Sequence, residues 1–561
     1  MRNMKRMTSL LLALTMVFSL AVTAFADEAG DEITESTYSI TINNSASGHI
    51  YEAYQIFTGK LSGNAENDAV AGTAAVLSDI LWGTGVSEEG QAALLAKYEA
   101  ENAAALAGKL NADNIKEFVT EVSKYLTTPA ASDETVEAGK YVIEGLTAGY
   151  YLIKDQNGSL NGDNDSYTSY IMEVIEDSTV SPKSSVPEVQ KKVKDINDST
   201  ESKMTDWQDS ADHDIGDTVP FQLKATLASN VADYLKYKVV FHDTMSRGLT
   251  FVKITSVTIV NQDGDVITLT EGQYAVATAA LTDNAQTENF VEGTALTITI
   301  EDVKGLGAEN DAEVIVEYEA TLNTEAILGA PGNPNVVYLE YSNNPNWGWD
   351  IWNDTDGDKE WDEGETPDEE EDETDDENTG KTPEDKVIVF TYKTVINKVD
   401  ANNDALAGAE FKLEKYNAND KTWEEIAVVK NEDGTVFTFS GLDDGLYCLT
   451  ETLAPEGYNA IDPIYFEVTA EHQVLAEDPQ LTKLDATETN ADGSDLAEGT
   501  VGSFTVTHDL KAGSLSADVV NKAGVVLPET GGMGTTLFYM VGAFLVLSAT
   551  VLLVTKRRMA M

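Results

Sequence analysis

The segment Tyr447–Tyr458, with the sequence YCLTETLAPEGY, is the most specific motif inside this chain. Around it, residues 409–413, 437–439 and 465–468 alternate apolar with polar side chains. A period of two is that of a strand with one face in a core and the other in water. The pattern predicts a β-sandwich domain over residues 386–524.

The motif closely resembles the E-box of sortase-assembled pilins and of the B-type repeat in collagen adhesins. Residues 396–400 (INKVD) and 519–522 (VVNK) resemble the first and last strands of the same repeat. This resemblance implies an amide that forms spontaneously inside the core, between Lys398 and Asn521. The E-box glutamate, Glu451, would catalyse its formation.

The side chains themselves support this chemistry. Ile396 and Lys398 share one face of an alternating strand, so a buried Ile396 implies a buried lysine. Burial disfavours both an ammonium and a carboxylate, which makes a neutral, nucleophilic amine beside a protonated Glu451 plausible. The acid would polarise the Asn521 carbonyl and carry protons, and ammonia would leave. The alternative is a lysine that reaches water and a glutamate in a surface ion pair.

Residues 186–345 divide into short strands separated by turns, as in the strand at 249–260 followed by the turn residues 261–264. This pattern predicts a second β-sandwich. In the first strand, Val189, Lys191 and Val193 share one face, so Lys191 is the inward candidate.

Residues 241–250 (FHDTMSRGLT) resemble the segment with the catalytic aspartate in the A-type domains of the same adhesins and pilins. Residues 338–345 (YLEYSNNP) resemble their last strand. The resemblance implies a second bond, from Lys191 to Asn343, with Asp243 as the proton donor and acceptor. Asn343 has the same parity as Leu339 and Tyr341, which favours it over Asn344, although a β-bulge would reverse this choice. For the lysine, Lys192 is the alternative to Lys191.

Residues 37–182 form the first domain. Strand-like segments at 38–42 and 149–153 enclose an Ala-, Leu- and Glu-rich middle that predicts helices between 88 and 125. The segment 149–155 (GYYLIKD) looks like an E-box strand with aspartate in place of glutamate, and the opening strand has no lysine. We therefore expect a β domain with a helical insertion and without a crosslink.

Residues 180–184 (VSPKS), at the junction of the first two domains, resemble the pilin motif of Gram-positive pili. That motif usually has tyrosine where this chain has Ser181. The resemblance implies that Lys183 is the nucleophile that a pilin sortase joins to a sorting signal on the next subunit. The flanking serine and proline indicate an exposed linker. A linker lysine without a role is the alternative.

Both ends of the chain carry export signals. Residues 1–26 have the basic, apolar and small-residue regions of a cleaved signal peptide. The C-terminal segment 525–561 contains LPETG at 527–531, then an apolar stretch long enough to cross a bilayer, then a basic tail. This order resembles a cell-wall sorting signal, which implies cleavage by a sortase between Thr530 and Gly531. Pilin-class and housekeeping sortases, peptidoglycan and accessory pilins are the implied partners.

The segment 346–385 is rich in acidic residues, cannot bury itself and predicts a linker or exposed loop. Part of it spaces carboxylates as a calcium-binding loop does, at Asp354, Asp356, Asp358, Asp362 and Glu365. The glycine comes too early, because an EF-hand needs it at the sixth position, where this chain has Lys359. A solvated acidic loop is therefore preferred over a calcium site, and no cofactor is required.

The composition limits the other functions. With 36 basic and 97 acidic residues, the net charge is -61, so nucleic acid and anionic lipid would be repelled. The single cysteine, Cys448, excludes an intramolecular disulfide. No hydrolytic or redox constellation is present, so we do not expect an enzyme. The chain resembles a backbone pilin of tandem immunoglobulin-like sandwiches that polymerises on the cell surface. The alternatives are a monomeric wall-anchored adhesin and an accessory or basal pilin.

Overall fold

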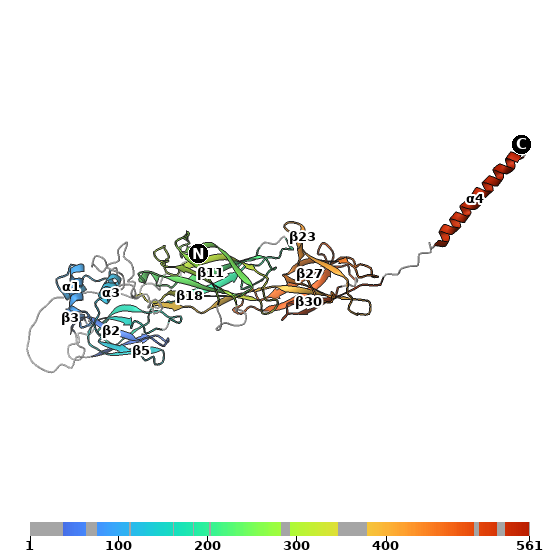
Figure 1. The fold of residues 1–561 in the computed structure, drawn as a ribbon. Helices are drawn as coiled ribbons and strands as arrows, with labels where there is room; N and C mark the ends of the chain where they lie inside the picture. The colour runs from blue at the N-terminus through green and yellow to red at the C-terminus, as the bar shows by residue number, and fades with distance from the viewer. Residues whose placement is uncertain are drawn as a thin grey trace, which may run out of the picture.

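The computed structural model describes residues 37–62, 76–111, 114–160, 162–182, 185–200, 204–281, 292–345, 378–498, 504–523 and 533–559. Three β-rich domains follow one another along the molecule (Figure 1). The predicted signal peptide, Lys183, the acidic residues Asp354 to Glu365 and the LPETG segment lie outside the described residues. The expected fold class is confirmed: sandwich domains, an early helical segment and one C-terminal apolar helix.

The first domain has two sheets, ordered β5-β1-β8 and β3-β2-β6-β7, with β4 paired to β2. Alternate residues of β2 and β6 face opposite cores, because side chains of a strand point to its two faces in turn. Tyr151 and Ile153 pack toward β1 and β5, and Leu152 packs toward the helices. The elements are β1 (Tyr38–Asn43), β2 (Tyr51–Ser62), β3 (Val76–Trp82), α1 (Glu88–Lys97), α2 (Ala103–Ala107), α3 (Ile115–Ser123), β4 (Ala131–Asp133), β5 (Lys140–Leu146), β6 (Gly149–Asp155), β7 (Ser169–Val174) and β8 (Ser178–Val180).

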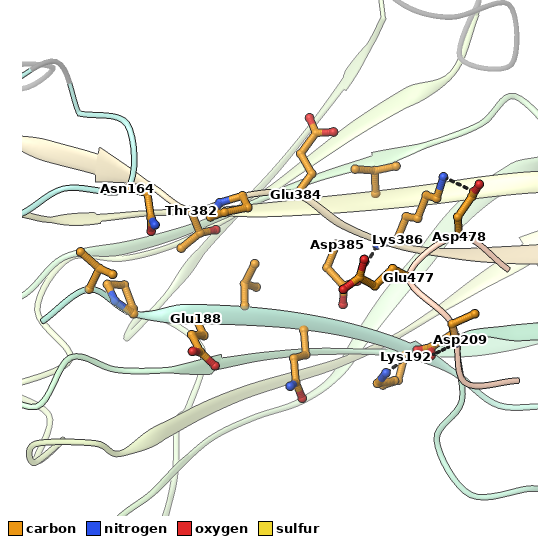
Figure 2. Close-up of a pocket in the computed structure, with 17 residues that line it drawn as sticks. Asn164, Glu188, Lys192, Asp209, Thr382, Glu384, Asp385, Lys386, Glu477 and Asp478 are labelled. Carbon is orange, nitrogen blue, oxygen red and sulfur yellow. Dashed lines mark hydrogen bonds and ion pairs between the residues drawn. The ribbon is translucent and has the colours of Figure 1, made fainter. Parts of the chain in front are cut away.

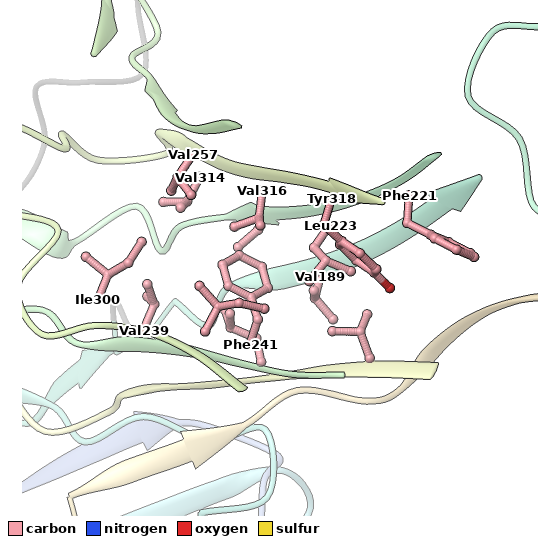
Figure 3. Close-up of a cluster of buried hydrophobic side chains, with 14 of the residues drawn as sticks. Val189, Phe221, Leu223, Val239, Phe241, Val257, Ile300, Val314, Val316 and Tyr318 are labelled. Atoms are coloured by element: carbon pink, nitrogen blue, oxygen red, sulfur yellow. The ribbon is translucent and has the colours of Figure 1, made fainter. Parts of the chain in front are cut away.

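The second domain is a sandwich of the sheets β14-β13-β17-β11-β9 and β10-β20-β18-β12-β16-β15, with β19 paired to β18. Figure 3 shows Val189, Leu223, Phe241 and Val316 in the layer between these sheets. Its elements are β9 (Glu188–Val193), β10 (Ser210–Asp212), β11 (Thr218–Thr226), the 3-10 helix η1 (Val231–Asp233), β12 (Val239–Met245), β13 (Leu249–Val260), β14 (Val266–Thr268), β15 (Ala275–Ala280), β16 (Thr294–Ile300), β17 (Glu313–Leu322), β18 (Asn333–Ser342), β19 (Thr379–Lys381) and β20 (Asp385–Phe390).

The boundary between the second and third domains differs from the prediction. Residue 386, the predicted start of the third domain, lies within β20, which pairs with β18 and β10 in the second domain. Val387 and Val389 belong to the core of that domain, because they face its interior on alternate positions of β20. By its pairing β20 belongs to the second domain, which resumes after the acidic segment. Ile388 and Phe390 on the other face of β20 pack in the core of the third domain, whose first own strand is β21.

The third domain packs the sheet β24-β25-β21-β30-β29 on the sheet β23-β22-β26-β27-β28. Its strands are β21 (Tyr392–Val399), β22 (Glu410–Asn417), β23 (Thr422–Ile426), β24 (Val428–Lys430), β25 (Val436–Leu442), β26 (Gly445–Leu453), β27 (Ile464–His472), β28 (Leu481–Thr489), β29 (Val506–Asp509) and β30 (Ser514–Val520). The chain ends in α4 (Met533–Met559). Within α4, residues Tyr539–Arg557 are long and apolar enough to cross a membrane, with a mean hydropathy of 1.8.

Candidate functional site

A buried lysine, aspartate and tyrosine meet in the core of the second domain. Lys191 on β9 contacts Asp243 on β12, and its Nζ lies 3.1 Å from the hydroxyl of Tyr318 on β17. The Tyr318 hydroxyl donates to Asp243 Oδ2 at 3.0 Å. All three side chains are at most 1% exposed. Burial lowers the pKa of the Lys191 amine, against the opposing effect of Asp243, and raises the pKa of the Asp243 carboxyl.

Asn335 completes this cluster. Its Nδ2 donates to the Tyr318 hydroxyl at 2.7 Å, the side chain is fully buried, and its Oδ1 has no hydrogen-bond partner in the described part of the chain. The Tyr318 hydroxyl therefore contacts the lysine, the acid and the amide together. Sequence reasoning missed both Tyr318 and Asn335.

Asn343, the residue predicted to react with Lys191, lies elsewhere. On β18, Val337 stands opposite Asp243, so Asn343 is about 20 Å further along the strand, whereas Asn335 is only about 7 Å away. Asn335 has the same parity as Asn343, which is why alternation alone could not separate them. Asn343 instead donates to Asp165 of the first domain at 3.0 Å.

The two alternative residues also lie away from the cluster. The Asn344 amide donates to Asn378 Oδ1 at 2.9 Å. Lys192 contacts Asp209 at a groove between β9 and β20, where Figure 2 shows this ion pair and that of Lys386 with Asp478. At this groove the backbone N–H of Lys191 donates to Asp385 Oδ2 at 2.6 Å, which ties the first strand to β20.

The third domain brings its predicted residues into one buried cluster. Asn521 Nδ2 donates to Glu451 Oε2 at 3.0 Å, while Glu451 Oε1 and Asn521 Oδ1 have no hydrogen-bond partner in the described residues. Lys398 is fully buried and donates to the carbonyls of Val399 and Val519 at 3.0 and 2.9 Å. Burial lowers the pKa of the Lys398 amine, and the nearby Glu451 carboxylate opposes this shift.

Parallel pairing of β21 with β30 explains how these residues meet. Lys398 stands opposite Val519, and the backbone N–H of Asn521 donates to Val399 O at 3.1 Å. The first strand and the end of the last strand are therefore neighbours. A lysine and an asparagine that are more than a hundred residues apart are thus buried at the same end of this strand pair, and the asparagine donates to the E-box glutamate.

The equivalent position in the first domain has different chemistry. Asp155 accepts from His49 Nδ1 at 2.7 Å and from the N–H and hydroxyl of Thr168 at 2.7 and 2.8 Å. The opening strand β1 has the sequence YSITIN and supplies no amine. Asp155 thus holds the His49 ring and the start of β7 in place through hydrogen bonds.

Two domain families match this chain. Residues 215–345 match the family described as "Gram-positive pilin backbone subunit 2, Cna-B-like domain", and residues 393–480 match the SpaA prealbumin-like fold domain. A curated relative is the trypsin-resistant surface T6 protein of Streptococcus pyogenes serotype M6. It is 26% identical over 424 residues, which are 67% of this chain and 70% of that protein.

Solved structures of major pilins are also similar. The T6 backbone pilin of Streptococcus pyogenes aligns with 88% of this chain and 99% of its own at 19% identity and a TM-score of 0.49. The major pilin SpaD of Corynebacterium diphtheriae aligns with 87% of this chain and 98% of its own at 16% identity and a TM-score of 0.42.

Proposed function

Because this chain is a Gram-positive pilin backbone subunit, a structural protein with Cna-B-like and prealbumin-like domains, we propose that it forms the shaft of a covalently polymerised pilus. A sortase cysteine would attack the Thr530 carbonyl and release the amine of Gly531. The Lys183 amine of the next subunit would then take the acyl group as an amide. The order of LPETG, apolar helix and basic tail supports this reaction.

The proposed partners follow from that reaction. A pilin-class sortase would join copies of this chain, and a housekeeping sortase would transfer the basal copy to peptidoglycan. Accessory pilins would attach through the same chemistry. The fibre would thus stand on the cell wall, with only its base anchored there.

We also propose that two internal amides stiffen each subunit. The observation that carries this proposal is the contact of Lys191, Asp243 and Asn335 with one Tyr318 hydroxyl. The second amide would join Lys398 to Asn521, with Glu451 as the catalytic acid. Both bonds would link the first strand of a domain to a strand late in the same domain.

Each bond would form by the same balanced reaction. The neutral lysine amine attacks the asparagine side-chain carbonyl carbon, and the protonated Asp243 or Glu451 stabilises the developing oxyanion. A proton passes from the lysine nitrogen through the carboxyl to the leaving nitrogen. Ammonia departs, a secondary amide remains, and the acid regains its proton. A dry core favours the neutral amine that this reaction needs.

Replacement of Asn335 tests the partner of Lys191. The wild-type protein should fall short of its sequence mass by one ammonia for each bond. In Asn335→Ala the mass deficit should be smaller by one ammonia, because no acceptor carbonyl faces Lys191. The matched variant Asn343→Ala should keep the wild-type deficit. Intact mass spectrometry of the mature protein measures both. A deficit that survives Asn335→Ala but disappears in Asn343→Ala would reject Asn335.

Immunogold labelling tests the position of the subunit in the fibre. An antibody against the third domain should label pili along their whole length at regular intervals, because every copy of a shaft subunit presents that domain. Label confined to the tip or the base would identify an accessory or basal pilin instead. Cells that lack this gene are the control.

A further inference from the structure

The joint between the second and third domains contains charged side chains away from both proposed crosslinks. The segment that includes β10 lies against the strand ends of the third domain. Asp209 N–H donates to Val474 O at 2.8 Å, and Ile215 N–H donates to Gly441 O at 3.1 Å. These bonds exist only while the domains are docked.

His472 of the third domain enters the second domain at this joint. Its Nδ1 lies 2.7 Å from the Ser210 hydroxyl, which donates to the Gln473 carbonyl at 2.9 Å. The hydroxyl has one proton, so it accepts from the ring, and Nδ1 carries hydrogen. The other nitrogen, Nε2, lies 3.5 Å from Asp195 Oδ2 and 3.3 Å from Asp212 Oδ1. A doubly protonated ring satisfies all of these acceptors.

Lys415 is a second cation of the third domain that enters the joint. Its Nζ contacts Asp443 and lies 2.6 Å from Asp214 Oδ2 and 3.9 Å from Asp198 Oδ2. The turn beside it also contacts the second domain, because the N–H of Asp443 donates to Asp214 and the N–H of Asp444 donates to Asp212. The third domain thus presents two cations and two amides to the carboxylates of the second.

Acidic groups outnumber basic groups at this joint. The groups that face His472 and its neighbours are Asp195, Asp198, Asp212, Asp214, Asp217, Asp443, Asp444, His213, Lys415 and the Tyr392 hydroxyl. Burial of excess negative charge is costly unless protons neutralise part of it. We propose that docking of the third domain onto the second takes up protons, so that the joint tightens as the pH falls and loosens as it rises toward 10.

The shifts in pKa agree with this direction. Burial opposes the charged ring of His472, but hydrogen bonds to Asp195 and Asp212 raise its pKa from 6.5 to about 10. Burial likewise opposes a charged His213, but Asp217 raises its pKa to about 9; because Asp217 lies in the same domain, this shift does not depend on docking. Burial raises the pKa of Asp214 to about 6 and that of Asp444 to about 7.

The raised pKa of His472 sets the sign of the linkage. The docked joint holds a proton that the undocked group would lose, so its stabilisation is complete below the ordinary pKa and disappears above the raised one. For His472, whose carboxylate partners belong to the other domain, this window runs from about 6.5 to about 10. Burial would raise the pKa of Asp212, but the hydrogen bond and charge of His472 lower it below the ordinary value. The contribution of the Asp212 carboxylate to docking is therefore lost only in stronger acid, below this window.

Hydrogen exchange of the full chain in detergent micelles between pH 6 and 10 tests the proposal. After correction for intrinsic exchange, peptides that cover 441–446 and 472–476 should lose protection by about tenfold for each pH unit between 7 and 10 from His472 alone. The core peptide 437–439 should keep its protection. Corrected protection of the joint peptides that does not change with pH would overturn the proposal.

Two variants sharpen the result. His472→Gln should reduce the pH dependence by about one proton, whereas His508→Gln, at an exposed position of the same domain, should leave it unchanged. Asp195→Asn keeps the imidazole but removes one carboxylate that raises the docked pKa of His472, so the loss of protection should still begin near pH 6.5 but end, and have its midpoint, at a lower pH. An unchanged midpoint in Asp195→Asn, or an equal effect of the two histidine variants, would also overturn the proposal. The test needs neither polymerisation nor an internal amide, so its outcome is independent of the proposed function.

Discussion

Cells that carry Lys183→Ala are expected to lose the whole high-mass ladder that the wild-type protein gives on denaturing gels of cell-wall extracts. The ladder consists of subunits joined by amides that survive boiling in detergent. Without the Lys183 amine, the Thr530 acyl group has no pilin acceptor and passes to peptidoglycan. A single wall-linked species should replace the ladder.

A second lysine variant controls for general damage. Lys253 lies on β13 with 61% of its side chain exposed, in a surface ion pair with Glu319 of the kind that contributes little to stability. Lys253→Ala should therefore leave the ladder intact. If the ladder persists in Lys183→Ala, the shaft assignment is wrong and a monomeric adhesin becomes the better description. Peptide mapping of the wild-type polymer should show Thr530 joined to Lys183.

Loss of either catalytic carboxyl is expected to cost one internal amide and about 5 kcal/mol of domain stability. Asp243→Asn and Glu451→Gln keep the side-chain volume but remove the acid. Each proposed amide closes a loop of more than about 100 residues, and such a crosslink stabilises by about 5 kcal/mol because it restricts the unfolded chain. Intact mass should rise by one ammonia, and denaturant unfolding of the affected domain should shift to lower concentration.

The mass separates bond loss from simple destabilisation. Glu467 is an exposed glutamate on β27 of the same domain, so Glu467→Gln should change neither mass deficit nor stability. A Glu451→Gln protein that retains the full deficit would show that the bond forms without the acid. A wild-type third domain with its complete sequence mass would reject the Lys398 amide altogether.

The sequence predicted the local elements well because their signals are local. Alternation with a period of two indicated β22, β25 and β27, and the Ala-rich middle of the first domain indicated the helices now seen as α1, α2 and α3. The boundary was placed at 386 because β20 directly precedes β21 in the sequence, so this strand of six residues was assigned to the third domain. Its pairing with β18 is a contact across that acidic segment, which no local pattern records.

The sequence by itself determined which residues point inward: Lys191 and Lys398 by parity with apolar neighbours, and Glu451 by its motif. Only the tertiary structure decided which amide lies beside Lys191. Asn335 on β18 and Asn343 just past the end of that strand have the same parity, so alternation cannot separate them, whereas the fold places Asn335 beside the Tyr318 hydroxyl. The cluster around His472 likewise joins residues of two domains, because docking brings together charges that are far apart in the chain.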